Sequence, residues 1–202
     1  IGLTGGIGAG KSEALAAFAR CGAAVLSSDA AVHDLYRDPE VVAAVAGRFG
    51  PGVLDGAGSV DRRALGARAF AEDGGVRFLE GLLHPRIGAR RRAWIAEQAA
   101  RTPPPPLLVC EVPLLFEAGL EGEFDAVLVV TAPEPVRRRR VEARGQGFAE
   151  RAARQLPEEE KVAGADAAFV NDGDLDALRA WVADRYAEYA GRNCDEHPAG
   201  DA

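Results

Sequence analysis

The sequence predicts an α/β fold with a parallel sheet of five strands flanked by helices. Three observations support this. Short apolar runs alternate with longer segments of helical periodicity. The first apolar run leads into a glycine-rich turn that opens a helix. The longest helical stretch, at about 40–104, interrupts the alternation between the second and third strands, so we expect it to be an inserted subdomain.

The first half of the chain contains two expected strands and most of the insertion. In the first helix, Leu15, Phe18 and Ala19 fall at i, i+3 and i+4. We expect breaks at Asp38-Pro39 and at His84-Pro85. The expected elements are a strand at 1–3, a helix at 11–21, a strand at 24–26, helical segments at 30–48, a loop at 50–58 and two or three helices at 62–101.

The second half begins with four consecutive prolines, residues 103–106, which form a stiff connector because proline cannot continue a helix. Compact apolar runs follow, as is typical of central parallel strands. The expected elements are strands at 107–110, 125–130 and 167–170, a helix at 134–143, an arginine-rich lid at about 144–161, a closing helix with Leu175, Leu178, Val182 and Tyr189 on one face, and a disordered tail at 192–202.

Composition narrows the class of protein. The chain has 202 residues, 48% hydrophobic and 27% charged, which predicts one globular domain at 1–191 with a core at about 1–39 and 107–191. It has no apolar run long enough for a transmembrane helix, so we expect no membrane partner. The net charge of −7 argues against a nucleic-acid coat, although a local basic groove stays open. We expect a monomer or weak oligomer.

The cysteines and the start of the chain bear on its location. Cys21, Cys110 and Cys194 are too few and too scattered to predict a disulfide framework or a zinc site. No basic-then-apolar signal peptide opens the sequence. Together these features predict a cytoplasmic protein.

Residues 5–12 match the phosphate-binding pattern G-x-x-x-x-G-K-[ST] in full. Glycines let backbone N–H groups converge on phosphate oxygens, and the following helix points its positive end at them. Lys11 would reach the β- and γ-phosphates, and Ser12 would offer a hydroxyl to Mg²⁺. The alternative is a glycine-rich turn that caps an ordinary helix, but the preceding strand and following amphipathic helix favour a nucleotide site.

Two carboxylates lie where strands are expected to end. The carboxyl ends of parallel strands face the ligand crevice, so Asp29 could accept the proton of an attacking hydroxyl. It could equally be the N-cap of a helix. Glu111 ends the third expected strand, where it could hold Mg²⁺ through water.

Apolar residues follow Glu111 in the sequence Val-Pro-Leu-Leu-Phe-Glu. Leu114, Leu115 and Phe116 could line a pocket for a partly apolar substrate or form a flap packed on the core. His84 could bind a substrate phosphate or ribose, or could be a structural turn residue.

Arginines crowd the region from 137 to 154. Arginines on a mobile lid can meet the charge that phosphoryl transfer develops and exclude water. Arg140 and Arg144, spaced i and i+4, are expected to share a helix face, and Arg151 is the next candidate. The other arginines fit a solvated helix face.

Taken together, these residues resemble the dephospho-CoA kinase family. The matching segments run in family order and are residues 2–12, Val25 to Asp29, Leu83-His84-Pro85 with Ile87, residues 112–117, the lid set of Arg140, Arg144, Arg151 and Gln155 running into Lys161, and Ala165-Asp166 with Asn171 and Gly173.

The resemblance implies a P-loop kinase fold and transfer of the ATP γ-phosphate to the ribose 3′-hydroxyl of dephospho-CoA. It implies catalytic roles for Asp29 as base and for Lys11, Arg140 and Arg144. The implied ATP-binding residues are Gly6, Ile7, Gly8, Ala9, Gly10, Lys11, Ser12, Glu13, Arg144 and, near the adenine, Asn171. The implied residues for dephospho-CoA are His84, Pro113, Leu114, Leu115, Phe116 and Arg151.

The sequence departs from the family pattern at several positions. Ser27 stands where the family usually has an aspartate, Glu13 replaces a threonine, and Glu111 replaces an aspartate. The lid is about one helical turn short. These departures keep two alternatives open: a kinase for another small nucleotide-like acceptor, and a catalytically weak paralogue that binds ATP or CoA. A nucleotide-dependent switch is disfavoured because the sequence lacks a guanine-reading Asn-Lys-x-Asp.

Overall fold

The computed structural model describes residues 1–145, 147–191 and 194. The chain packs as two units, one made of residues 1–27 with the described residues from 97 onward, and one made of residues 28–96. We call them the sheet unit and the helical unit. The expected tail, apart from Cys194, lies outside the described residues.

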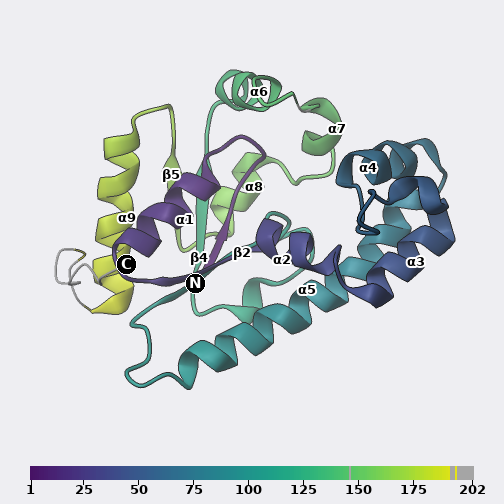
Figure 1. Ribbon diagram of the computed structural model, residues 1–202. Coiled ribbons are helices and arrows are strands. Elements are labelled where there is room, and N and C mark those ends of the chain that lie inside the picture. The colour runs from purple at the N-terminus through teal and green to yellow at the C-terminus, as the bar shows by residue number, and fades with distance from the viewer. Residues whose placement is uncertain (146, 192–193, 195–202) are drawn as a thin grey trace. The chain divides into compact units, whose positions relative to one another are not determined.

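The sheet unit contains five parallel strands in the order β2-β3-β1-β4-β5. Figure 1 labels β2, β4 and β5 of this sheet. The strands are β1 (Gly2–Thr4), β2 (Ala24–Ser27), β3 (Leu108–Glu111), β4 (Val127–Thr131) and β5 (Ala167–Val170). Every residue of β1 and β4 is buried, as a strand covered on both faces requires. The predicted fold class is confirmed.

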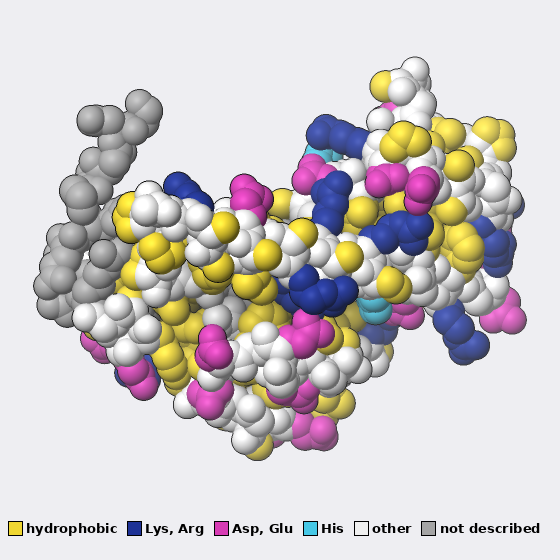
Figure 2. Space-filling view, turned by 90° about the horizontal axis from the view of Figure 1, so that it is seen from below, with side chains coloured by type: hydrophobic (Ala, Val, Ile, Leu, Met, Phe, Trp, Pro, Cys, Tyr) yellow, Lys and Arg dark blue, Asp and Glu magenta, His cyan; other side chains and the backbone are white. Residues whose placement is uncertain are grey.

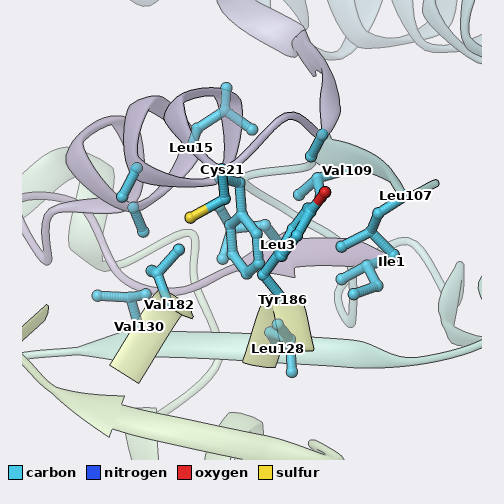
Figure 3. Close-up of a cluster of buried hydrophobic side chains, with 14 of the residues drawn as sticks. Ile1, Leu3, Leu15, Cys21, Leu107, Val109, Leu128, Val130, Val182 and Tyr186 are labelled. Carbon is cyan, nitrogen blue, oxygen red and sulfur yellow. The ribbon is translucent and has the colours of Figure 1, made fainter. Parts of the chain in front are cut away.

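Helices complete the sheet unit. They are α1 (Lys11–Arg20), α6 (Glu134–Glu142), α7 (Ala149–Ala152), α8 (Glu158–Ala163) and α9 (Leu175–Ala190), with a 3₁₀ turn η2 at Glu121–Glu123. Helices α1 and α9 lie side by side, and their apolar faces meet the strands in one core (Figure 3). Tyr186 and Val182 of α9 point into this core beside Leu3, Val130 and Leu15.

The buried faces of these two helices differ in detail from the prediction. In α9 the buried residues are Leu178, Val182 and Tyr186, whereas Leu175 in the first turn is exposed. In α1, Ala14 and Ala17 are buried and Ala19 is exposed. The helical spacing of the buried residues in α9 was predicted correctly. The sequence does not fix which residue begins the buried face of a helix.

The helical unit contains α2 (Ser28–Leu35), α3 (Pro39–Phe49), the 3₁₀ turn η1 (Pro51–Val53), α4 (Arg62–Ala71) and α5 (Gly75–Ala99), whose last residues return to the sheet unit. The predicted break at Asp38-Pro39 is confirmed, since Asp38 caps α3. The predicted break at His84-Pro85 is wrong, because α5 continues through Pro85.

Most charges of the helical unit are on its surface. Ion pairs join Arg48 and Arg68 to Glu72, Arg86 to Glu40, and Arg90 to Asp34. Acidic and basic side chains are interspersed on the face of the molecule drawn in Figure 2. Among the described residues, no helix is both long enough and apolar enough to cross a bilayer.

The expectation of unpaired cysteines is wrong for two of the three, although a single disulfide is no framework. Cys21 at the end of α1 forms a disulfide with Cys194, 173 residues away in the chain, and Cys110 is buried and is not disulfide-bonded. The sequence conceals this pair because only the packing of α9 against α1 brings the two chain segments together. The cysteines therefore no longer support the cytoplasmic expectation.

Candidate active site

The phosphate-binding loop lies between the last residue of β1 and the first turn of α1. Gly5, Gly8 and Gly10 have φ values of 141°, 79° and 108°, which favour glycine. A Cβ on Gly5 would also overlap the carbonyl oxygen of Val130 in β4. The loop therefore needs glycine both for its backbone angles and for its contact with the sheet. It leads into the positive end of α1, which is a favourable place for an anion.

The lysine of the loop folds back over the backbone. Lys11 Nζ donates to the carbonyl oxygens of Gly5 and Gly6, at 3.0 and 3.1 Å. Ser12 and Glu13 are exposed in the first turn of α1. The loop thus places a cation and a hydroxyl at one helix end, which suits a polyphosphate with its metal ion.

Two residues from outside the phosphate-binding loop donate hydrogen bonds to its backbone. Asn171, directly after β5 and 2% exposed, donates from Nδ2 to the carbonyl oxygen of Ala9 at 2.8 Å. Arg140 of α6 donates to the carbonyl oxygens of Gly8 and Ala9, at 3.3 and 3.4 Å. It also donates to Asn171 Oδ1 at 3.3 Å. In this structure Arg140 and Asn171 therefore contact the loop itself.

A carboxylate and a hydroxyl lie at the carboxyl ends of β3 and β2. Ser27 and Glu111 are register partners, and Ser27 Oγ donates to Glu111 Oε2 at 3.2 Å. Glu111 is 5% exposed. Ser27 thus supplies a donor to the carboxylate beside it, where an aspartate would instead place two acids side by side.

The loop from 113 to 117 follows Glu111. Leu115 is fully buried, whereas Pro113, Leu114 and Phe116 are half-buried. Phe116 packs near Gly164, where an added Cβ would lie 2.9 Å from the ring. Leu115 therefore fills the core, and the half-buried residues remain the candidates for contact with a substrate.

The arginines of α6 face different neighbours. Arg137 donates to the carbonyl oxygen of Ala132 at 3.0 Å and lies 4.0 Å from Glu158. Arg138 pairs with Glu134 and stacks on Phe148. Helix α6 ends at Glu142, so the predicted shared helix face of Arg140 and Arg144 is not formed. Arg144 is exposed in the following turn, and Arg151 is exposed in α7.

Two candidates belong to the helical unit. Asp29 is the second residue of α2, and its side chain lies outside what the structure describes. His84 is exposed on α5. Neither is placed here relative to the loop of the sheet unit.

Sequence reasoning missed a buried charge network beside the loop. Thr131 Oγ1 donates to Glu158, and the fully buried Lys161 lies 3.8 Å from Glu158 and 3.1 Å from Glu117. The only local signal is the i, i+3 spacing of Glu158 and Lys161, which exposed helices share.

Comparison with known proteins assigns the family. The sequence profile of dephospho-CoA kinases matches residues 1–177. A dephospho-CoA kinase of Anaeromyxobacter dehalogenans is 44% identical over 190 residues, covering 92% of this chain and 89% of that protein. One of Mycolicibacterium paratuberculosis is 43% identical over 178 residues; the match covers 86% of this chain but only 43% of that longer protein. A crystal structure of TT1252 from Thermus thermophilus aligns with a TM-score of 0.72 at 35% identity, covering 93% of this chain and 95% of that one. With its complete phosphate-binding loop and five-stranded parallel sheet, the chain belongs to the dephospho-CoA kinase family.

Proposed function

We propose that the chain transfers the γ-phosphate of ATP to the ribose 3′-hydroxyl of dephospho-CoA, giving CoA and ADP. The observation that carries the proposal is the complete phosphate-binding loop, with Lys11 over its carbonyls, in a chain of this family. The 3′-oxygen attacks the γ-phosphorus, the bond to the bridging β–γ oxygen breaks, and ADP leaves. Lys11 compensates charge on the β- and γ-phosphates.

Asp29 is the base in this proposal, since it follows β2 by two residues and the carboxyl ends of parallel strands face the ligand. It would take the proton that the 3′-hydroxyl loses. Arg140, Arg144 and Arg151 would meet the transferred charge, as the family resemblance implies. The half-buried residues Pro113, Leu114 and Phe116, together with His84, would contact dephospho-CoA.

The residues present fit a magnesium ion. Among the described residues, no three His, Cys, Asp or Glu side chains cluster as a metal site would need. Mg²⁺ does not require such a cluster, because it keeps waters and is held by substrate phosphates with one or two protein oxygens. Ser12 would bind it directly and Glu111 through water. When bound, the ion would neutralise charge on the phosphates.

ADP release from the purified chain with ATP and Mg²⁺ tests the proposed reaction. Release should depend on dephospho-CoA, and CoA should appear by mass spectrometry. CoA is the matched control acceptor, since its 3′-oxygen already carries a phosphate and should support no release. Equal release without dephospho-CoA, or preference for a different alcohol, would overturn the proposal.

Asp29→Asn tests the base. We expect kcat to fall by roughly 10²- to 10⁴-fold while the KM for ATP changes little, because general-base catalysis contributes about that much. Asp34→Asn, an exposed change on the same helix, is the control. A near-normal kcat for Asp29→Asn, with lower thermal stability, would instead make Asp29 a helix-terminal residue only.

A further inference from the structure

One side chain joins the phosphate-binding loop to the loop at 113–117. Gln155 lies between α7 and α8 and is half-buried. Its Oε1 accepts a hydrogen bond from the backbone N–H of Ile7 at 2.8 Å. Its Nε2 donates to the carbonyl oxygen of Pro113 at 3.3 Å. A carboxamide can make this bridge because it carries an acceptor and a donor on one carbon.

The residues that follow Gln155 contact Glu117, the last residue of the loop 113–117. The backbone N–H of Leu156 donates to Glu117 Oε1 at 2.8 Å, and Lys161 Nζ lies 3.1 Å from that oxygen. Lys161 is fully buried, and Glu117 is 14% exposed. Residues 155–161, which we call the bridging segment, therefore contact the first and last residues of the loop 113–117.

The bridging segment also lies against the phosphate-binding loop through Glu158. This carboxylate accepts from Thr131, the last residue of β4. A Cβ on Gly6 would collide with Glu158 and come within 2.7 Å of Arg137. The start of α8 is thus in close contact with the glycine loop, and Gln155 is held over it by its neighbours.

The energetics point to a positional role. Lys161 faces two carboxylates but makes no geometrically satisfactory hydrogen bond, and Glu117 Oε2 has no hydrogen-bond partner in the described part of the chain. Apolar packing is often as stabilising as a buried ion pair, or more so, when the pair leaves hydrogen-bonding capacity unfilled. The pair does connect α8 to the last residue of the loop 113–117.

We propose that Gln155 is a positioning residue that holds the ATP site and the acceptor site in register, with the Lys161–Glu117 pair as the anchor of its segment. This inference rests on the proposed function, because it takes the loop 113–117 as part of the acceptor site. Loss of the bridge leaves each loop able to bind its own substrate and misaligns the two. Water then competes better with the 3′-hydroxyl for the γ-phosphate, and ATP is hydrolysed to ADP and phosphate.

Gln155→Ala and Gln155→Asn test the inference, the second keeping the amide on a shorter arm. An initial-rate matrix in both substrates should show kcat reduced roughly 10- to 100-fold, since small misplacements cost about that much. Each KM should stay within about threefold of the unaltered enzyme. The ratio of ADP formed to CoA formed should rise above that of the unaltered enzyme, which is a change that loss of folded protein alone would not produce.

Glu159→Gln is the matched control, since Glu159 is exposed on α8 and should leave kcat and the ratio unchanged. An unchanged kcat in both Gln155 variants would overturn the inference. So would a lower KM for ATP at unchanged or higher kcat, which would show that Gln155 competes with phosphate for the Ile7 N–H. Failure of the unaltered chain to use dephospho-CoA would overturn the proposed function itself, and the inference with it.

Discussion

At the scale of single residues, Lys11 has the most sharply defined task in the proposed reaction. Its ammonium group lies at hydrogen-bond distance from two carbonyl oxygens of the loop it follows. The charge is therefore already positioned at the loop, and in the proposed reaction it would need little reorganisation to meet phosphate oxygens. Such prepositioned charge is the main protein contribution to phosphoryl transfer.

We expect Lys11→Ala to lower kcat by roughly 10²- to 10³-fold, the usual effect of removing one prepositioned charge or donor. The coupled ADP assay measures it. Arg20→Ala is the control, because Arg20 is an exposed cation at the opposite end of the same helix and should leave kcat within about twofold. Retention of more than about a tenth of the activity by Lys11→Ala would contradict the role given to Lys11.

Asn171 contacts the phosphate-binding loop through a hydrogen bond to the carbonyl oxygen of Ala9. Asn171→Asp replaces a buried amide donor by an acceptor that faces the carbonyl oxygen of Ala9, and it adds negative charge beside the phosphate site. We expect the KM for ATP to rise about tenfold or more, and the free energy of unfolding to fall by about 1–3 kcal/mol. Initial rates at varied ATP concentration and urea unfolding measure these effects.

The neighbouring exposed residue offers a matched control for this change. Asp172→Asn makes the reverse isosteric replacement one residue later and should leave both quantities nearly unchanged. If Asn171→Asp bound ATP normally, the contact with Ala9 would be structural only.

The site residues differ in how far the sequence could predict them. The phosphate-binding loop was predictable because its glycines, lysine and serine act within eight consecutive residues. The targets of Arg140 and Gln155 were not, since each contacts backbone atoms more than 100 residues away along the chain. Which of the four consecutive arginines faces the loop is decided by the packing of α6.

At the scale of elements, α5 shows where local rules are outweighed. Proline lacks an N–H and ordinarily ends or kinks a helix, which is why His84-Pro85 predicted a break. In the structure α5 runs from Gly75 to Ala99, and Pro85 lies exposed inside it. Val41, Val45 and Leu83 are buried in the core of the helical unit, and this packing favours the continuous helix.

Removing this proline should therefore stabilise the helical unit. We expect Pro85→Ala to raise the free energy of unfolding by about 1–3 kcal/mol, because alanine restores a helical hydrogen bond and is the best helix former. Urea unfolding followed by circular dichroism measures the change, and the KM for dephospho-CoA is determined on the same sample. An unchanged KM would show that the proline is not needed for substrate binding.

Gly81→Ala on the same helix provides the comparison. An added methyl there meets nothing within 4 Å, so the gain should be about 0.5–1 kcal/mol with no effect on activity. A loss of stability in Pro85→Ala would mean that the packing of α5 depends on the proline.

At the scale of the whole molecule, the order of elements was predictable and the tertiary links were not. Alternating apolar runs and amphipathic segments identified all five strands because each strand is short, apolar and followed by a helical segment. The disulfide joins Cys21 to Cys194, 173 residues away along the chain, and the spacing of the cysteines does not predict it. The bond links Cys194, which follows α9, to Cys21, the C-cap residue of α1. Helix α1 begins with Lys11.

This link should contribute stability without affecting the chemistry. Opening it lets the unfolded chain explore more conformations, so Cys194→Ser should lower the free energy of unfolding by about 2–4 kcal/mol under oxidising conditions. Helix α1 has ten residues, so the disulfide is about 15 Å from its first turn, and the KM for ATP should stay unchanged.

Urea unfolding with and without reductant measures the effect. Reductant should lower the free energy of unfolding of the unaltered chain and leave that of Cys194→Ser unchanged. Cys110→Ala, which removes the buried cysteine outside the disulfide, should keep the full response to reductant. An unaltered chain whose stability ignores reductant would show that the bond makes no such contribution, and a parallel loss of ATP binding would show that α1 transmits the change to its phosphate-binding end.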